Sequence, residues 1–182
     1  NLVDSAYAVA MDGRIAEAIS INRDGLAQTP EDSVALQCEF YSCLLYCYHR
    51  LGDYQEALRY GELCLLYDEQ HGTQEDLSAS LGNLAGVYSS AGKQDVAIEY
   101  LRRAIDIENT LLSSDSTHTP KSLAIRKAML GEVLLAKSKS LSGAEQKGIL
   151  SEALQLTDDA LQIERQLGRR AQEGMRLAQL AN

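Results

Sequence analysis

Apolar residues along this chain follow a helical spacing, and the spacing itself repeats about every 40 residues. The pattern i, i+3, i+4, i+7 is clearest in two stretches, at Tyr41, Leu44, Leu45 and Tyr48 and again at Leu81, Leu84, Ala85 and Tyr88. Such spacing places the apolar side chains on one face of a helix and polar ones on the other. The pattern therefore predicts amphipathic helices arranged as an internal repeat.

Glycine and alanine mark the same points in successive copies of this repeat. Gly13, Gly52 and Gly92 recur 39 and 40 residues apart, and each is followed five residues later by an alanine, Ala18, Ala57 or Ala97. A glycine suits the left-handed position that ends a helix. An alanine permits two helices to approach closely, where a larger side chain would force them apart. Each copy therefore predicts two helices joined at a glycine turn.

The copies divide the chain into four units and the beginning of a fifth. Their approximate ranges are 1–30, 31–72, 73–115 and 119–168, with a truncated copy at 169–182. The fourth copy carries a longer connection between its halves, around residues 137–144. One helix pair cannot bury its apolar face alone, so stacked pairs must share a continuous core. We expect an all-α fold in which residues 1–182 form one array of antiparallel helix pairs.

Composition and charge narrow the classes of partner. Apolar residues make up 45% of the chain and charged residues 24%, as in globular proteins. With 17 basic and 26 acidic residues, the formal net charge is −9. This charge disfavours nucleic acid and anionic membrane surfaces as partners, and no apolar run approaches the roughly 20 residues of a membrane-spanning helix. The compartment stays open: cytoplasmic, or periplasmic if a signal sequence has been removed, since the chain begins at Asn1 rather than Met.

The repeat resembles the tetratricopeptide repeat. Two sets of residues in this sequence match the residue pattern of that family best. They are Leu44, Tyr48, Gly52, Tyr54, Ala57 and Cys64, and Leu84, Ala85, Tyr88, Gly92, Ala97 and Ala104. The spacing of about 40 residues and tails such as 65–72 are similar to the extended variant of kinesin light chains and bacterial sensor and regulator proteins. The resemblance implies a right-handed α-solenoid that binds a protein or peptide without catalysis, as the sensor or interaction region of a larger bacterial regulatory protein.

In this family the first helices of successive pairs line a concave groove that holds the ligand. Carried over to this sequence, the groove candidates are Glu39, Ser42, Cys43, Tyr46, His49, Arg50, Asn83, Ser90 and Glu132. Asn83 matches the family's groove asparagine, whose amide offers a donor and an acceptor to an extended backbone. Arg50 is the lone groove cation, so the Lys/Arg set that clamps a carboxylate in chaperone-binding members is not reproduced.

No catalytic residue, cofactor or metal ligand is predicted. The run from Gly86 to Lys93 departs from a phosphate-binding loop, because five residues separate its glycines and Gln94 replaces the Ser/Thr. The cysteines are interpreted as buried free thiols that fill small spaces. A metal- or thiol-responsive switch at Cys43, Cys47 and Cys64 is kept as a remote alternative.

A second alternative is structural. The truncated copy at 169–182 carries apolar residues, Met175, Leu177 and Leu180, that a complete fifth pair would bury. A homodimer could form through this exposed C-terminal repeat, which would make the array a self-associating module. The truncation also leads us to expect that the natural protein continues beyond Asn182.

Overall fold

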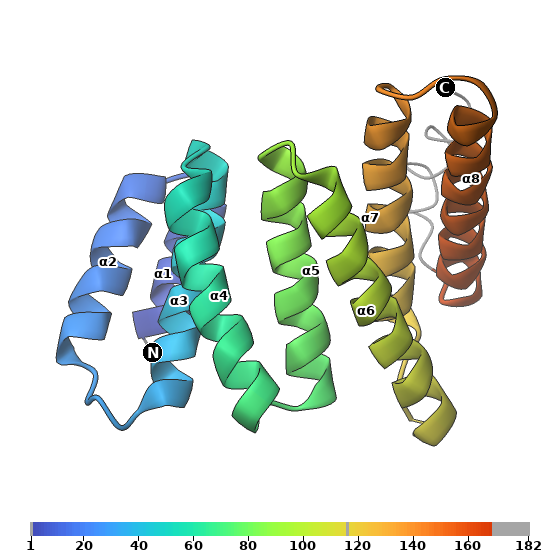
Figure 1. The fold of residues 1–182 in the computed structure, drawn as a ribbon. Coiled ribbons are helices and arrows are strands. Elements are labelled where there is room, and N and C mark those ends of the chain that lie inside the picture. The colour runs from blue at the N-terminus through green and yellow to red at the C-terminus, as the bar shows by residue number, and fades with distance from the viewer. Residues whose placement is uncertain (1, 116, 169–182) are drawn as a thin grey trace. The chain divides into compact units, whose positions relative to one another are not determined.

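A computed structural model describes residues 2–115 and 117–168, and within these residues the only regular secondary structure is α-helix (Figure 1). The helices are α1 (Leu2–Met11), α2 (Ile15–Gln28), α3 (Val34–Leu51), α4 (Tyr54–His71), α5 (Gln74–Ser90), α6 (Gln94–Ser114), α7 (Lys121–Ser138) and α8 (Gly143–Gln166). The prediction of an all-α fold built from helix pairs is confirmed. None of the described helices is both long and apolar enough to cross a membrane.

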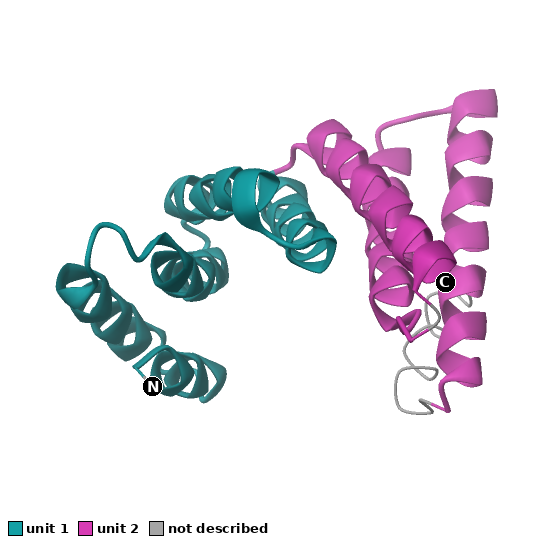
Figure 2. Ribbon diagram, turned by 90° about the horizontal axis from the view of Figure 1, so that it is seen from below, with its two compact units in different colours: residues 1–91 teal, residues 92–182 magenta. Residues whose placement is uncertain are grey.

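The chain separates into two compact units, residues 1–91 and 92–182 (Figure 2). In the first unit, α1 packs on α2 and α3, α2 on α3, α3 on α4, and α4 on α5. In the second, α6 packs on α7 and α7 on α8. The division lies between α5 and α6, inside the predicted copy at 73–115, and the grouping of all residues into one array stays a prediction.

Glycines end helices where the repeat predicted. Gly52 follows α3 with φ of +78°, and Gly92 lies between α5 and α6 with φ of +77°. Both are in the left-handed region, which a residue with a Cβ adopts only with strain. The chain can therefore reverse direction within two or three residues, which keeps the helices α3 and α4 side by side.

Small residues lie at the close approaches between helices of the first unit. Ala57 is fully buried in a cluster with Leu44, Leu45, Tyr48, Tyr60 and Val87. A Cβ on Gly61 of α4 would lie 2.6 Å from a methyl carbon of Leu45 and 2.6 Å from one of Leu84. A Cβ on Gly25 of α2 would lie 2.4 Å from the ring of Phe40. These glycines set the distances between α2 and α3 and between α4 and both α3 and α5.

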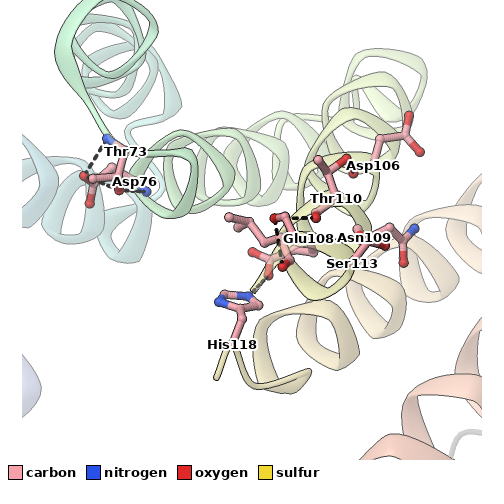
Figure 3. A network of polar contacts seen from close by, with 10 residues as sticks. Thr73, Asp76, Asp106, Glu108, Asn109, Thr110, Ser113 and His118 are labelled. Atoms are coloured by element: carbon pink, nitrogen blue, oxygen red, sulfur yellow. Dashed lines mark hydrogen bonds and ion pairs between the residues drawn. The ribbon is translucent and has the colours of Figure 1, made fainter. Parts of the chain in front are cut away.

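The second unit has its own core. Ala97 of α6 is fully buried, which confirms its predicted packing role, and Leu101 and Ala104 of the same helix are fully buried as well. Between α7 and α8, a Cβ on Gly131 would lie 2.8 Å from the hydroxyl of Thr157. The connection to α7 is held by His118, whose Nε2 lies 3.0 Å from the buried Glu108 carboxylate on α6 (Figure 3).

The predicted apolar end of the array lies outside the described residues. Met175, Leu177 and Leu180 all belong to the range 169–182, which the structure does not describe. The homodimer predicted through this range therefore stays a prediction.

Candidate functional site

A hollow of about 340 Å³ opens in the first unit between α3, the end of α4 and the start of α5. Its lining residues are Ala35, Cys38, Glu39, Ser42, Cys64, Tyr67, Asp68, His71, Gly72, Thr73, Asp76, Ala79, Ser80 and Asn83. Three of the predicted groove residues, Glu39, Ser42 and Asn83, are among them. Residues about 40 positions apart in the sequence therefore meet at one site.

Helical spacing explains how these side chains reach the hollow. On α3, Glu39 and Ser42 are three residues apart, and on α5, Asp76, Ala79 and Asn83 follow at intervals of three and four. Residues at these intervals share one face of a helix. Each helix therefore contributes one stripe of side chains to the hollow.

The start of α5 is fixed by a capping box (Figure 3). The backbone N–H of Thr73 donates to the Asp76 carboxylate at 3.0 Å, and the Asp76 backbone N–H donates to the Thr73 hydroxyl at 3.2 Å. Reciprocal bonds of this kind satisfy two backbone donors that the first helical turn leaves open. They also hold Thr73 and Asp76 in place at the rim of the hollow.

Asp68 is the most enclosed carboxylate of the site. It lies on α4 and accepts a hydrogen bond from the hydroxyl of Ser80 on α5. Burial raises the pKa of Asp68, the Ser80 bond opposes this shift, and the nearby Asp76 carboxylate adds to it. The pKa of Asp68 stays above its ordinary value because the site holds negative charge in a partly desolvated place.

Two thiols form the floor beside Ser42. The Cys64 thiol donates to the backbone carbonyl of Cys38 at 3.4 Å and lies 3.4 Å from the Ser42 hydroxyl. Burial raises the pKa of Cys38 to about 12 and that of Cys64 to about 11. Both thiols are therefore neutral at physiological pH, and the floor is uncharged.

A second contact joins the other ends of α3 and α5. His49 Nε2 lies 2.8 Å from the Ser90 hydroxyl, so two more predicted groove residues lie together. Burial lowers the pKa of His49, and the neighbouring Arg50 lowers it further, which favours the neutral imidazole. Arg50 itself is exposed, whereas Tyr46 is half-buried and packs against the core formed with α1 and α2.

Cys43 does not reach this surface, and its assignment to the groove is corrected. Its side chain is fully buried against Ala6 and Val9 of α1, and its sulfur accepts a hydrogen bond from the Asn22 amide at 3.1 Å. The helix pair α1–α2 covers the position on α3 that corresponds to Asn83 on α5. Glu132 is exposed on α7, belongs to the second unit and is not among the residues that line the hollow.

The sequence prediction misses the residues that α4 contributes. Tyr67, Asp68 and His71 lie in the last turns of α4 and reach the hollow, together with Asp76 at the start of α5. A signal is present, because the 40-residue spacing already indicates a second helix longer than usual. The groove candidates come from first helices alone, and they therefore exclude this extension.

The four cysteines fall into two buried pairs, Cys38 with Cys64 and Cys43 with Cys47, and all four are free thiols. In the second pair, hydrogen bonds from Cys47 and Asn22 lower the pKa of Cys43, while the same contact and burial raise that of Cys47. Among residues 2–115 and 117–168, no group of three or more His, Cys, Asp or Glu side chains is arranged to hold a metal ion. The metal- or thiol-responsive alternative stays a prediction.

We expect the thiols of Cys38 and Cys64 to be almost inert in the folded protein. Because the pKa of Cys64 is raised to about 11, its thiolate fraction at pH 8 is roughly 100-fold below that of an ordinary thiol. Titration with Ellman's reagent at pH 8 should show slow reaction at these positions before urea is added and four fast thiols afterwards. Cys38→Ser and Cys64→Ser variants assign the signals, and rapid native reaction at either position would contradict the expectation.

The comparisons with known proteins agree with this architecture. Residues 38–109 match the family model of the tetratricopeptide repeat. No curated protein sequence matches the chain. Two solved structures of nearly identical TPR-like repeats from a Podosopora anserina kinesin light chain are each 18% identical to it. Their TM-scores are 0.69 and 0.58, over 99% of this chain and 91% and 92% of theirs.

BtubC (BKLC) from P. vanneervenii is also similar, with 17% identity and a TM-score of 0.62 over 97% of this chain and 75% of that one. At these identities the likeness establishes the fold, an α-solenoid of helix pairs. Arrays of this class are in general scaffolds for protein interaction. Residues 38–109 therefore match the tetratricopeptide repeat, and the fold of the chain is similar to that of the kinesin light chain repeats.

Proposed function

We propose that this chain is a non-catalytic scaffold that binds an extended peptide segment on its first unit. The segment lies along the inner face, which we define as the exposed stripes of α3 and α5 from Glu39 and Asn83 at the hollow to His49 and Ser90. The observation that carries the proposal is the convergence of Glu39, Ser42 and Asn83 on one hollow of about 340 Å³.

The stripe on α5 suits a close approach of a ligand backbone. Ala79, Asn83, Gly86 and Ser90 follow one another at helical spacing, and only Asn83 extends beyond a small side chain. Asn83 is exposed, and its amide can donate to a peptide carbonyl and accept from a peptide N–H. An extended peptide needs both, because its own backbone groups are unpaired.

The proposal also includes the larger protein in which this chain would act. The extended repeat and its resemblance to sensor and regulator proteins support a role as the interaction region of a larger bacterial regulatory protein. Binding would act there by favouring one arrangement of the array over another, in proportion to the difference in affinity.

The test uses a displayed library of random 12-residue peptides selected on the full chain. We expect Asn83→Ala to weaken the selected peptides about tenfold, because the peptide's backbone groups lose a buried partner. Fluorescence anisotropy measures the dissociation constants. Asn109→Ala, at an exposed asparagine of α6, is the matched control and should bind as the unaltered chain does.

Two outcomes decide the proposal. Selected peptides whose affinity depends on Asn83 but not on Asn109 support binding on the inner face. Peptides that bind equally well to both variants, or the recovery of no peptide at all, contradict it. Circular dichroism of each variant verifies that the helices are intact.

A further inference from the structure

We propose that the hollow beside Asn83 receives the side chain of a lysine or arginine of the bound peptide. The inference rests on the proposed function and names the chemistry of its ligand: an extended peptide with a basic residue at one position. Three observations carry it, namely the charge of the rim, the neutral and apolar groups of the floor, and the absence of a lysine or arginine paired with the rim carboxylates within the described chain.

The rim of the hollow is acidic on three sides. Glu39 comes from α3, Asp68 from α4 and Asp76 from α5, so three helices each direct a carboxylate to the same space. No lysine or arginine is among the lining residues, and none of these three carboxylates forms an ion pair with another described residue. The negative charge there is therefore available to a partner.

Some described carboxylates outside the hollow do have an arginine partner. Glu17 pairs with Arg14 at 3.0 Å, Glu56 with Arg59 at 2.9 Å, and Glu152 with Arg102 at 2.9 Å. These pairs lie on helix surfaces, where water also screens the charge. At the hollow, by contrast, the half-buried Asp68 carboxylate is held by the neutral hydroxyl of Ser80.

The floor and walls of the hollow combine apolar surfaces with neutral groups. Ala35 and Ala79 are short, Tyr67 offers a ring, and the Cys38 and Cys64 thiols are neutral. Lysine and arginine bury their aliphatic stems on such surfaces while the charged end stays at a polar rim. A glutamate or aspartate of the ligand would instead meet three like charges, which repel it.

Charge at longer range favours the same partner. The chain carries a formal net charge of −9, so a cationic segment is attracted before it makes contact. The Arg50 side chain lies at the other end of α3, so basic residues of the peptide are favoured at the hollow and not along the whole inner face. Position, as well as charge, therefore determines which peptide fits.

The experiment determines the sequences of the peptides that the library selection yields. It then measures the affinity of these peptides for two isosteric variants, Glu39→Gln and Asp68→Asn. Both changes keep the shape of the side chain, and the amide oxygen that Asp68→Asn introduces can still accept the Ser80 hydrogen bond. Glu31→Gln and Asp24→Asn are the matched controls, because they remove the same charge from exposed positions outside the hollow. All four variants are first compared with the unaltered chain by circular dichroism and thermal unfolding.

We expect a Lys or Arg at one fixed position of the selected peptides. Glu39→Gln and Asp68→Asn should each weaken their binding about three- to tenfold, a range typical of partly desolvated charge pairs. The control variants should change binding less than about twofold, as distant exposed charges do in physiological salt. Replacing the basic residue with norleucine should weaken binding to the unaltered chain and remove the sensitivity to Glu39→Gln.

The outcomes separate this inference from the function on which it rests. Peptides that depend on Asn83 but lack a fixed basic residue, or that bind Glu39→Gln and Asp68→Asn unchanged, overturn the inference and leave peptide binding in place. Peptides that do not depend on Asn83 overturn both. Equal losses in the hollow variants and the control variants would show general charge attraction and would also overturn the inference.

Discussion

Leu84→Ala is expected to lower the free energy of unfolding by about 2–5 kcal/mol, the range for truncating a fully buried leucine. Leu84 lies on α5 with none of its surface exposed, and its side chain fills the space over Gly61 of α4. Removing three carbons there leaves a cavity that the flanking helices can close only in part. Urea unfolding followed by circular dichroism at 222 nm measures the loss.

Leu154→Ala provides the comparison for this prediction. Leu154 lies on α8 with 51% of its surface exposed, so truncation removes little buried area. We expect a change below about 1 kcal/mol. If the two variants unfold at the same urea concentration, the apolar stripe of α5 has been assigned to the wrong face.

The helices and their turns could be predicted from the sequence because the same pattern of leucines and glycines recurs in several copies of the repeat. Leu44 and Leu84, or Gly52 and Gly92, hold equivalent positions, and each copy supports the interpretation of the others. The structure buries both leucines fully and gives both glycines positive φ. Local spacing and backbone geometry determine these features, and neither depends on distant parts of the chain.

The burial of Cys43 could not be predicted from its equivalent position in the repeat. Its position on α3 corresponds to that of Asn83 on α5, yet Cys43 is fully buried and Asn83 is exposed. The difference comes from the neighbours: α1 and α2 pack over Cys43, whereas the space beside Asn83 is the hollow. A repeat pattern gives the direction of a side chain on its own helix, but burial depends on what packs against that helix.

The candidate site could be predicted only in part, for the same reason. Glu39, Ser42 and Asn83 follow from their positions on first helices, and all three line the hollow. Asp68 does not follow from that rule, because it lies on a second helix and reaches the site only through the extra turns of α4. With Asp76, which the prediction also missed, it changes a site with one predicted carboxylate, that of Glu39, into one rimmed by three, which is why the partner could not be inferred from the sequence.

The structural role and the proposed ligand-binding role fall on the same helices. The contact between Gly61 and Leu84 determines how closely α4 approaches α5, and these two helices carry Asp68, Asp76 and Asn83 to the hollow. A change in their distance would separate the Asp68 carboxylate on α4 from Asp76 and the Asn83 amide on α5 by a comparable amount. The glycine is therefore a packing residue whose size bears on the geometry of the candidate site.

Gly61→Ala tests this directly, with an expected loss of about 1–3 kcal/mol in the free energy of unfolding. The added carbon would lie 2.6 Å from both Leu45 and Leu84, so these two buried side chains would have to shift to admit it. Gly148→Ala on α8 is the control, since a Cβ there meets no atom within 4 Å. This second change should stabilise the protein by about 0.5–1 kcal/mol, the usual gain from alanine inside a helix.

The double variant Gly61→Ala/Leu84→Ala separates crowding from a general weakening of α4. If the methyl group is unfavourable because it meets Leu84, truncating that leucine makes room for it, and the loss in the double variant should fall short of the sum of the single losses by more than about 0.5 kcal/mol. Urea unfolding of the four proteins completes the cycle. Strict additivity would mean that α4 and α5 are not in contact at this point, and the distance between the helices that hold the hollow would then have another cause.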